Sequence, residues 1–325
     1  MANKGKYYES QFEEATIELL REAHWQYTLG DDIHRKYTDP LIEEDLRNFL
    51  AVQYKDKNLT TSEMDGIVAN LRNTGGQNDY YALRNAFLLY RDGYDFAYSD
   101  SRDNPFRMEY IDFEHPDHNI FRCVNQFVMG QGRENRRPDI LLFINGIPVC
   151  IIELKNPTKQ NATIRDAHTQ ICTRYMRDIP ALLKYCALAV ISDGAKNALG
   201  TTYTPFEFFY EWKKIENEDK AGKGLDTLRT LIRGALSPER ILEILRDYVY
   251  FPDPTKEDDT TEIVCRYPQF FATRKLREHI LNHLRSVGGD GKGGTYFGAT
   301  GCGKTYTMLF LARQLVLRCR KQLGS

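Results

Sequence analysis

Two apolar runs around a turn dipeptide constrain the fold of this chain most. Residues 140–144 and 147–152 are mostly β-favouring side chains, and Asn145-Gly146 between them is typical of a tight turn. The segment therefore predicts the two strands of a hairpin. Taken alone, the same pattern fits an ordinary buried hairpin whose charged ends reach solvent.

Charged residues stand at the outer ends of this hairpin. Asp139 opens the first strand, and Glu153 and Lys155 close the second strand two residues apart, so their side chains leave the same face. Carboxylate oxygens suit Mg²⁺, which keeps several waters and bridges to substrate phosphate, and a lysine can orient or deprotonate one of those waters. The pattern predicts a metal-dependent nuclease in which Asp139 and Glu153 bind Mg²⁺ and Lys155 acts in catalysis.

The length of the hairpin turn decides whether the two carboxylates can share a metal. A two-residue turn pairs Asp139 with Ile152 and places Glu153 on the opposite face, whereas a three-residue connection pairs Asp139 with Glu153. We therefore expect an odd-numbered loop or a β-bulge. An uninterrupted two-residue hairpin would exclude the nuclease.

Composition narrows the class of protein. The chain has 325 residues, 42% of them hydrophobic and 27% charged, which is a globular balance with room for about two domains. No apolar stretch predicts a membrane span or a signal peptide. Seven cysteines without a CxxC spacing favour a reducing compartment, so we expect the cytoplasm. The net charge of −1 does not indicate nucleic acid, and any DNA contact must come from local basic clusters around Asp139 and Glu153.

A second motif lies near the C-terminus, where Gly298-Ala-Thr-Gly-Cys-Gly-Lys-Thr305 precedes an apolar run typical of a helix. This is a complete P-loop string for ATP. Its glycines let backbone N–H groups point at phosphate, its lysine reaches the β- and γ-phosphates, and its threonine hydroxyl binds Mg²⁺. The expected nucleotide-binding residues are Gly298, Thr300, Gly301, Gly303, Lys304 and Thr305. The strand before the loop is short, at residues 295–297, and the alternative is a glycine-rich loop that binds no nucleotide.

The residues after the P-loop helix do not complete an NTPase. No later strand ending in Asp-Glu is present to hold Mg²⁺ and position water. We therefore expect this chain to be an N-terminal fragment that binds ATP weakly and does not hydrolyse it.

The remaining pattern predicts an α/β fold with a mixed central sheet. We expect helices at 9–23, 61–71, 80–90 and 163–177, and strands at 107–113, 119–128 and 188–192. The charged, proline-containing segment 251–260 is the best domain linker. The expected domains are residues 1–250 and 251–325.

With both motifs in this order, the chain resembles the restriction subunit of type I restriction–modification enzymes. The resemblance is carried by segments along the whole chain: Glu109-Tyr-Ile-Asp-Phe-Glu-His-Pro116, Val124-Asn-Gln-Phe127, Arg136-Arg-Pro-Asp139, Glu153-Leu-Lys-Asn-Pro157, Ile191-Ser-Asp-Gly194, Trp212, Arg266-Tyr-Pro-Gln-Phe270 and the P-loop.

That resemblance implies a PD-(D/E)xK endonuclease domain followed by the first part of a RecA-like motor domain that translocates double-stranded DNA with ATP. It implies that Asp139 and Glu153 are metal ligands, that Lys155 is the catalytic lysine, and that Gln269 reads the adenine edge. It also implies separate modification (methyltransferase) and specificity subunits as partners, and no membrane.

One departure from the pattern of related nucleases concerns a Gln-x-x-x-Tyr element on the helix after the lysine. Here the candidates are Gln170 and Tyr175, which are five residues apart and would lie on different sides of a regular α-helix. Either the helix is irregular, or only one of the two serves the site, with Gln170 the stronger candidate. Glu13 is a further metal-site candidate, although a solvated helix charge is its simpler interpretation.

Two alternatives belong to other functional classes. One is an ATP-dependent DNA motor whose N-terminal domain binds DNA or partner subunits without cleaving, and Lys155 argues against it because such a module has no use for a lysine there. The other is a nucleotide-binding interaction module without DNA, which would show no salt-dependent affinity for DNA.

Overall fold

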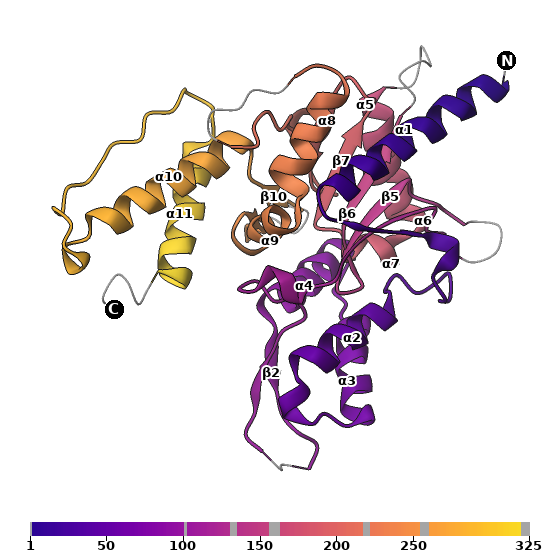
Figure 1. Ribbon diagram of the computed structural model, residues 1–325, viewed down its shortest axis with the longest axis horizontal. Helices are drawn as coiled ribbons and strands as arrows, with labels where there is room; N and C mark the ends of the chain where they lie inside the picture. The colour runs from indigo at the N-terminus through magenta and orange to yellow at the C-terminus, as the bar shows by residue number, and fades with distance from the viewer. Residues whose placement is uncertain are drawn as a thin grey trace.

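The computed structural model describes residues 2–100, 103–130, 135–155, 163–216, 222–253 and 260–319. Most of the predicted linker, residues 254–259, lies outside the described part of the chain. The architecture is mixed α/β, as predicted, with a central sheet flanked by helices (Figure 1).

The central sheet has six strands in the order β1-β4-β5-β6-β7-β8. The pairs β1/β4 and β6/β7 are parallel and the other three are antiparallel, so the sheet is mixed. Its strands are β1 (Gln26–Leu29), β4 (Phe121–Asn125), β5 (Ile140–Ile144), β6 (Ile147–Leu154), β7 (Leu188–Ser192) and β8 (Asn197–Gly200).

Helices cover both faces of this sheet. They are α1 (Ala2–Glu22), α2 (Glu43–Gln53), α3 (Thr61–Asn73), α4 (Asp79–Asp92), α5 (Ile164–Thr169), α6 (Met176–Asp178), α7 (Pro180–Leu183), α8 (Leu225–Leu231) and α9 (Pro238–Asp247), with π-helical turns η5 (Gln170–Tyr175) and η7 (Ile232–Leu236). Local sequence sets their starts. For α3, the Thr60 hydroxyl accepts from the Glu63 N–H while the Glu63 carboxylate accepts from the Thr60 N–H, which is a capping box.

The core is divided by the sheet into two clusters. The first core lies between one face of the sheet and helices that include α1, α4, α8 and α9, and the second core lies between the other face and α5–α7. In β5, Ile140 and Leu142 face the first core, whereas Leu141 and Phe143 face the second. Because both faces are covered by helices, the strands read as continuous apolar runs.

Smaller elements extend from this body. Strands β2 (Tyr94–Phe96) and β3 (Phe106–Met108) form a separate hairpin, and β9 (Val249–Tyr250) pairs with β10 (Ile263–Val264). Helices α10 (Tyr267–His283) and α11 (Lys304–Arg318) pack together to one side of the sheet body, as Figure 1 shows. No helix among the described residues is long and apolar enough to cross a membrane.

Two predicted strands differ from the structure. Of residues 107–113, only the start belongs to a strand, and β3 pairs with β2 rather than with the central sheet. The Asp112 carboxylate explains the break, because it accepts the N–H groups of Glu114 and His115 and so turns the chain. The short strand before the P-loop string is also absent, and residues 295–297 have no regular structure.

Candidate active site

A bulge in the β5–β6 hairpin sets the geometry of the predicted site. The turn has two residues, and both Asn145 (φ 50°) and Gly146 (φ 76°) adopt the left-handed conformation that a type I′ turn requires. Farther along the strands the register shifts by one residue, so that Ile140 pairs with Ile152. The prediction of an odd-numbered loop or a bulge is confirmed: a bulge corrects the register of a two-residue turn.

The bulge moves the side chains of β6 to the opposite face part-way along the strand. Before it, Ile147 and Val149 face the first core, whereas beyond it Cys150 and Ile152 do. Glu153 therefore leaves the strand toward the face of the second core. Continued by one step, the pairing of Ile140 with Ile152 sets Asp139 beside Glu153 at the sheet edge.

The two carboxylates lie close to each other, and that of Asp139 is bonded to the backbone. The Asp139 Oδ2 atom accepts the Leu154 N–H at 2.7 Å. The Glu153 side chain is only 1% exposed, and its Oε2 atom has no hydrogen bond of ordinary geometry among the described residues. Its charge is close enough to the Asp139 and Tyr175 side chains to raise the pKa of both. A buried carboxylate oxygen in this state is costly, because its hydration has been lost without replacement.

The burial of these carboxylates changes their acidity. Burial raises the pKa of Asp139 well above its ordinary range, and the neighbouring Glu153 charge raises it further, against the Leu154 N–H. Burial also raises the pKa of Glu153, and the Lys155 charge opposes this shift. Two crowded, desolvated carboxylates are the donor set that a hard divalent cation such as Mg²⁺ neutralises, so the residues present fit that ion.

Lys155 links the carboxylates to the helix that follows them. Its Nζ atom donates to Glu153 Oε1 at 2.8 Å and to Gln170 Oε1 at 2.7 Å. The Lys155 side chain is 14% exposed, so the ammonium is held in one place at the rim of the site. The structure therefore brings together four of the predicted residues: Asp139, Glu153, Lys155 and Gln170.

The π-helical turn η5 resolves the spacing of Gln170 and Tyr175. A π-helix bonds residues five apart, so these two side chains lie about one turn apart instead of on different sides. Gln170 Nε2 donates to the Tyr175 hydroxyl at 2.7 Å. The tyrosine is 3% exposed. The first of the two expected alternatives, an irregular helix, is confirmed.

A polar cluster that the sequence indicated only through Glu13 lies beside this edge. Glu13 Oε1 on α1 accepts from Asn125 Nδ2 at 2.8 Å and from Gln126 Nε2 at 2.9 Å. The Tyr27 hydroxyl in turn donates to Asn125 Oδ1 at 3.0 Å. The Glu13 charge is near enough to raise the pKa of Asp139. Asn125 and Gln126 contribute to the family resemblance, but no sequence pattern predicts a role for them.

Some of the basic residues on either side of the hairpin already have partners within the protein. Arg136 Nε donates to Asp178 Oδ2 at 2.7 Å, and Arg177 Nε donates to Asp178 Oδ1 at 2.6 Å. The Arg165 guanidinium lies over the Phe206 ring. Arg133 and Lys159 lie outside the described residues. Arg137 and Arg174 remain exposed.

The P-loop string forms a loop followed by α11, which starts at Lys304. Lys304 Nζ donates back to the carbonyl oxygens of Gly298 and Ala299 at 2.9 and 3.0 Å. Gln269 Nε2 lies 3.4 Å from both Cys302 O and Gly303 O. The structure thus places Gln269 against the loop. Of the other predicted residues here, Thr300, Gly301 and Thr305 are exposed.

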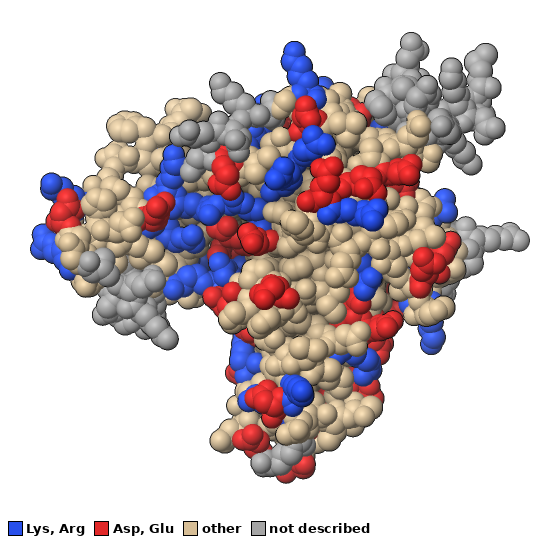
Figure 2. Space-filling model, viewed as in Figure 1, with Lys and Arg blue, Asp and Glu red and all other residues tan. Residues whose placement is uncertain are grey.

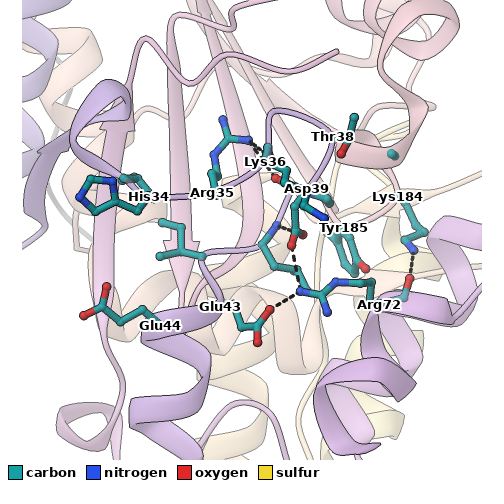
Figure 3. A pocket seen from close by; sticks show the side chains of 15 residues that line it. His34, Arg35, Lys36, Thr38, Asp39, Glu43, Glu44, Arg72, Lys184 and Tyr185 are labelled. Carbon is teal, nitrogen blue, oxygen red and sulfur yellow. Dashed lines mark hydrogen bonds and ion pairs between the residues drawn. The ribbon is translucent and has the colours of Figure 1, made fainter. Parts of the chain in front are cut away.

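A cavity of about 580 Å³ lies elsewhere, lined by residues of the segment 33–44 with Arg72, Ala181, Lys184 and Tyr185 (Figure 3). Several of its charged groups already have partners: Arg72 pairs with Asp39 and Glu43, and Lys184 Nζ donates to main-chain carbonyls at 2.8 and 3.1 Å. Because these groups already have partners, the cavity is a weaker candidate than the end of the sheet that carries Asp139, Glu153 and Lys155, which we call the carboxylate edge.

Comparison with known proteins identifies the family to which the chain is similar. Residues 6–208 match the family described as type I restriction enzyme R protein N terminus. The chain is 28% identical to the type I restriction enzyme HindI endonuclease subunit of Haemophilus influenzae, over 95% of this chain and 30% of that protein. It is 27% identical to a provisionally named type I restriction enzyme MjaIXP endonuclease subunit of Methanocaldococcus jannaschii, over 93% and 31%.

The chain therefore belongs to the family of type I restriction enzyme R protein N-terminal regions. It spans about a third of the length of these relatives.

Proposed function

We propose that this chain carries the nuclease centre of a type I restriction endonuclease subunit and that the centre is of the PD-(D/E)xK type. The observation that carries the proposal is the bulged hairpin, which brings Asp139 and Glu153 to one face with Lys155 bonded to Glu153. A plain hairpin would separate the two acids. A bulge next to a charged sheet edge commonly serves to re-aim a side chain at a functional site.

The residues divide the chemistry of phosphodiester hydrolysis between them. Asp139 and Glu153 would hold Mg²⁺, which when bound polarises the phosphate and supplies an activated water. Lys155 Nζ, fixed by Gln170, would orient the attacking water and take part in its deprotonation. The Tyr175 hydroxyl accepts from the Gln170 amide, and Gln170 in turn accepts from Lys155. The Lys155 ammonium is therefore held in position before substrate binds.

The proposed substrate is double-stranded DNA. Basic and acidic side chains are interspersed over the face shown in Figure 2, in keeping with a net charge of −1. DNA contact therefore has to come from basic residues close to the site, of which Arg137 and Arg174 are exposed. Arg137 precedes Asp139 by two residues, and Arg174 belongs to η5.

We also propose that residues 251–325 bind ATP through the P-loop and belong to a DNA-translocating motor. A pocket of about 390 Å³ beside the loop is lined by Gln269, Arg266, Tyr203, Tyr210 and Gly303, among others, and its size suits a nucleobase. Lys304 and Thr305 would bind the phosphates and Mg²⁺. Modification and specificity subunits are the proposed partners.

A crystal soaked in Mn²⁺ tests the nuclease proposal directly. We expect one anomalous peak within coordination distance of both Asp139 and Glu153. Glu153→Gln, which keeps the shape but removes the charge, should lose most of the peak. A wild-type crystal with no ion between the two acids would favour the alternative of a DNA motor whose N-terminal domain binds without cleaving.

A further inference from the structure

Three side chains that commonly bind metal ions gather on the turn between β3 and β4, and the proposed chemistry uses none of them. They are Asp112, His115 and His118, and one ligand atom from each lies within 4.8 Å of the other two. No other group of three such side chains is this close among the described residues. This cluster therefore needs an explanation separate from the carboxylate edge.

The carboxylate of the cluster is fixed by the backbone around it. The Asp112 side chain is 6% exposed, and its Oδ1 atom accepts the N–H groups of Glu114 and His115, both at 2.9 Å. The Asn119 amide holds the Asp112 main chain, since its Oδ1 accepts the Asp112 N–H at 2.9 Å and its Nδ2 donates to Asp112 O at 2.7 Å. One carboxylate oxygen thus serves the turn, and the other is left for side chains.

Both imidazoles direct a ring nitrogen to this second oxygen. His118 Nδ1 lies 2.9 Å and His115 Nδ1 3.3 Å from Asp112 Oδ2, and the two rings are stacked with centroids 4.8 Å apart. In a tetrahedral zinc site, bonds of about 2.0–2.1 Å place neighbouring ligand atoms roughly 3.3 Å apart. An ion can therefore replace the two hydrogen bonds with small ring movements, while each neutral imidazole keeps its proton on Nε2.

The donor set selects the kind of metal. Two imidazole nitrogens and one carboxylate oxygen suit a borderline transition ion such as Zn²⁺, whereas Mg²⁺ prefers oxygen ligands alone. The side chains of His115 and His118 are 64% and 48% exposed, which leaves a fourth position open to water. Gln53 Nε2 donates to Asp112 Oδ2 at 3.2 Å and so helps to orient that ligand.

We propose that Asp112, His115 and His118 form a Zn²⁺ site with three protein ligands and an open fourth position. The site is independent of the nuclease centre, because it shares no residue with the carboxylate edge.

The turn that carries this site also contacts the C-terminal helices. The Glu114 carboxylate lies 3.3 Å from the guanidinium of Arg246 on α9 and 3.8 Å from that of Arg318 on α11. Glu114 stands between the ligands Asp112 and His115 in the sequence. A bound ion therefore stiffens the turn through which the sheet body contacts α11, and Zn²⁺ should raise the melting temperature of the chain.

Zn²⁺ titration of the 325-residue chain, freed of metal with EDTA and followed by long-range ¹H–¹⁵N spectra of its imidazoles, tests the proposal without relying on activity. The Nδ1 resonances of His115 and His118 should shift together and reach their end point at one equivalent. Competition with a chelating dye measures the affinity. Gln53→Ala should weaken Zn²⁺ binding on the order of tenfold, and the double variant His115→Ala/His118→Ala should lose stoichiometric binding.

Two controls isolate the site. His279 and His283 on α10 also stack, with ring centroids 4.0 Å apart, but no third ligand completes a group with them among the described residues. His283→Ala should therefore leave the stoichiometric affinity for Zn²⁺ unchanged. Asp139→Asn, which disables the carboxylate edge, should leave it unchanged as well.

The outcomes separate this inference from the proposed function. Unshifted resonances of His115 and His118 would show that the cluster is a hydrogen-bonded turn only, and stoichiometric binding lost in Asp139→Asn but kept in the double variant would place the ion elsewhere. Either result overturns the Zn²⁺ site and leaves the nuclease proposal standing. Melting in EDTA verifies that the variants are folded, and the wild-type spectra decide the matter even where a variant is unstable.

Discussion

The two motifs of this chain contrast in how they are built. The carboxylate edge at Asp139 and Glu153 is mostly buried, and its side chains bond to one another and to the backbone. The P-loop string is largely exposed, follows a segment without regular structure, and has its lysine folded back onto its own carbonyls. The side chains of a site in a sheet are held in place by the core beneath them. The N–H donors of a phosphate-binding loop, in contrast, gain their hydrogen-bond partners only when a ligand binds.

The largest effect expected from this contrast is on cleavage. In a restriction complex whose endonuclease subunit contains this chain, Lys155→Ala should lower the cleavage rate about 10²–10⁴-fold, because a positioned proton-transfer group is lost. DNA-stimulated ATP hydrolysis should continue, since Lys304 is untouched. Plasmid linearisation and phosphate release measure the two activities. Wild-type cleavage by Lys155→Ala would remove this residue from the mechanism.

Substitution of one glycine in the hairpin turn and one in the P-loop string compares the rigidity of the two regions. A Cβ added at Gly146 would lie 2.1 Å from Ile42 O, whereas one added at Gly301 would meet nothing within 4 Å, and both glycines have positive φ (76° and 77°). Gly146→Ala should therefore cost roughly 3 kcal/mol of unfolding free energy, and Gly301→Ala about 1 kcal/mol.

Urea unfolding of the two variants measures this difference. Equal losses of stability would mean that the hairpin turn relaxes as freely as the loop.

Lys304→Ala tests whether the loop is organised by its ligand. At an ATP concentration 100 times the dissociation constant, with Mg²⁺ present, the wild-type chain should gain about 2.7 kcal/mol of stability. The variant should gain almost none, and its stability without ATP should be unchanged because the lysine bonds only to its own loop. Thermal shift assays with and without ATP decide the matter, and an equal shift in both proteins would contradict the P-loop assignment.

The smallest effect concerns the acidity of the carboxylate edge. Because burial raises the pKa of Asp139, the folded protein holds that proton more tightly than the unfolded chain, and stability falls as pH rises from the ordinary carboxyl pKa through the raised one. Asp139→Asn removes this loss. At neutral pH and in chelator, its melting temperature should exceed that of the wild type by roughly 2–4 °C.

This gain from Asp139→Asn should vanish at low pH, below the ordinary carboxyl pKa of about 3.9. A constant difference across pH would show that the effect is not electrostatic. Added Mn²⁺ should reverse the order of stability at neutral pH, since only the wild type has the charge to bind it.

Much of the fold could be predicted from local sequence. The apolar runs of β5 and β6, the turn at Asn145-Gly146, and the helices α3 and α4 were expected close to where they lie. These elements follow periodicity and turn chemistry, which are local. The strand predicted over 107–113 was mostly wrong because one side chain, Asp112, captures two backbone N–H groups and turns the chain.

The residue types of the candidate site and their order along the chain were determined by the sequence: two acids, a lysine and a glutamine around one hairpin and one helix. Only the tertiary structure decided their geometry. With both faces of the strands apolar, burial alone could not select the register, and the bulge at mid-strand did. The π-helical turn that unites Gln170 with Tyr175, and the amides that hold Glu13, likewise depend on packing between segments far apart in the sequence, which no local pattern encodes.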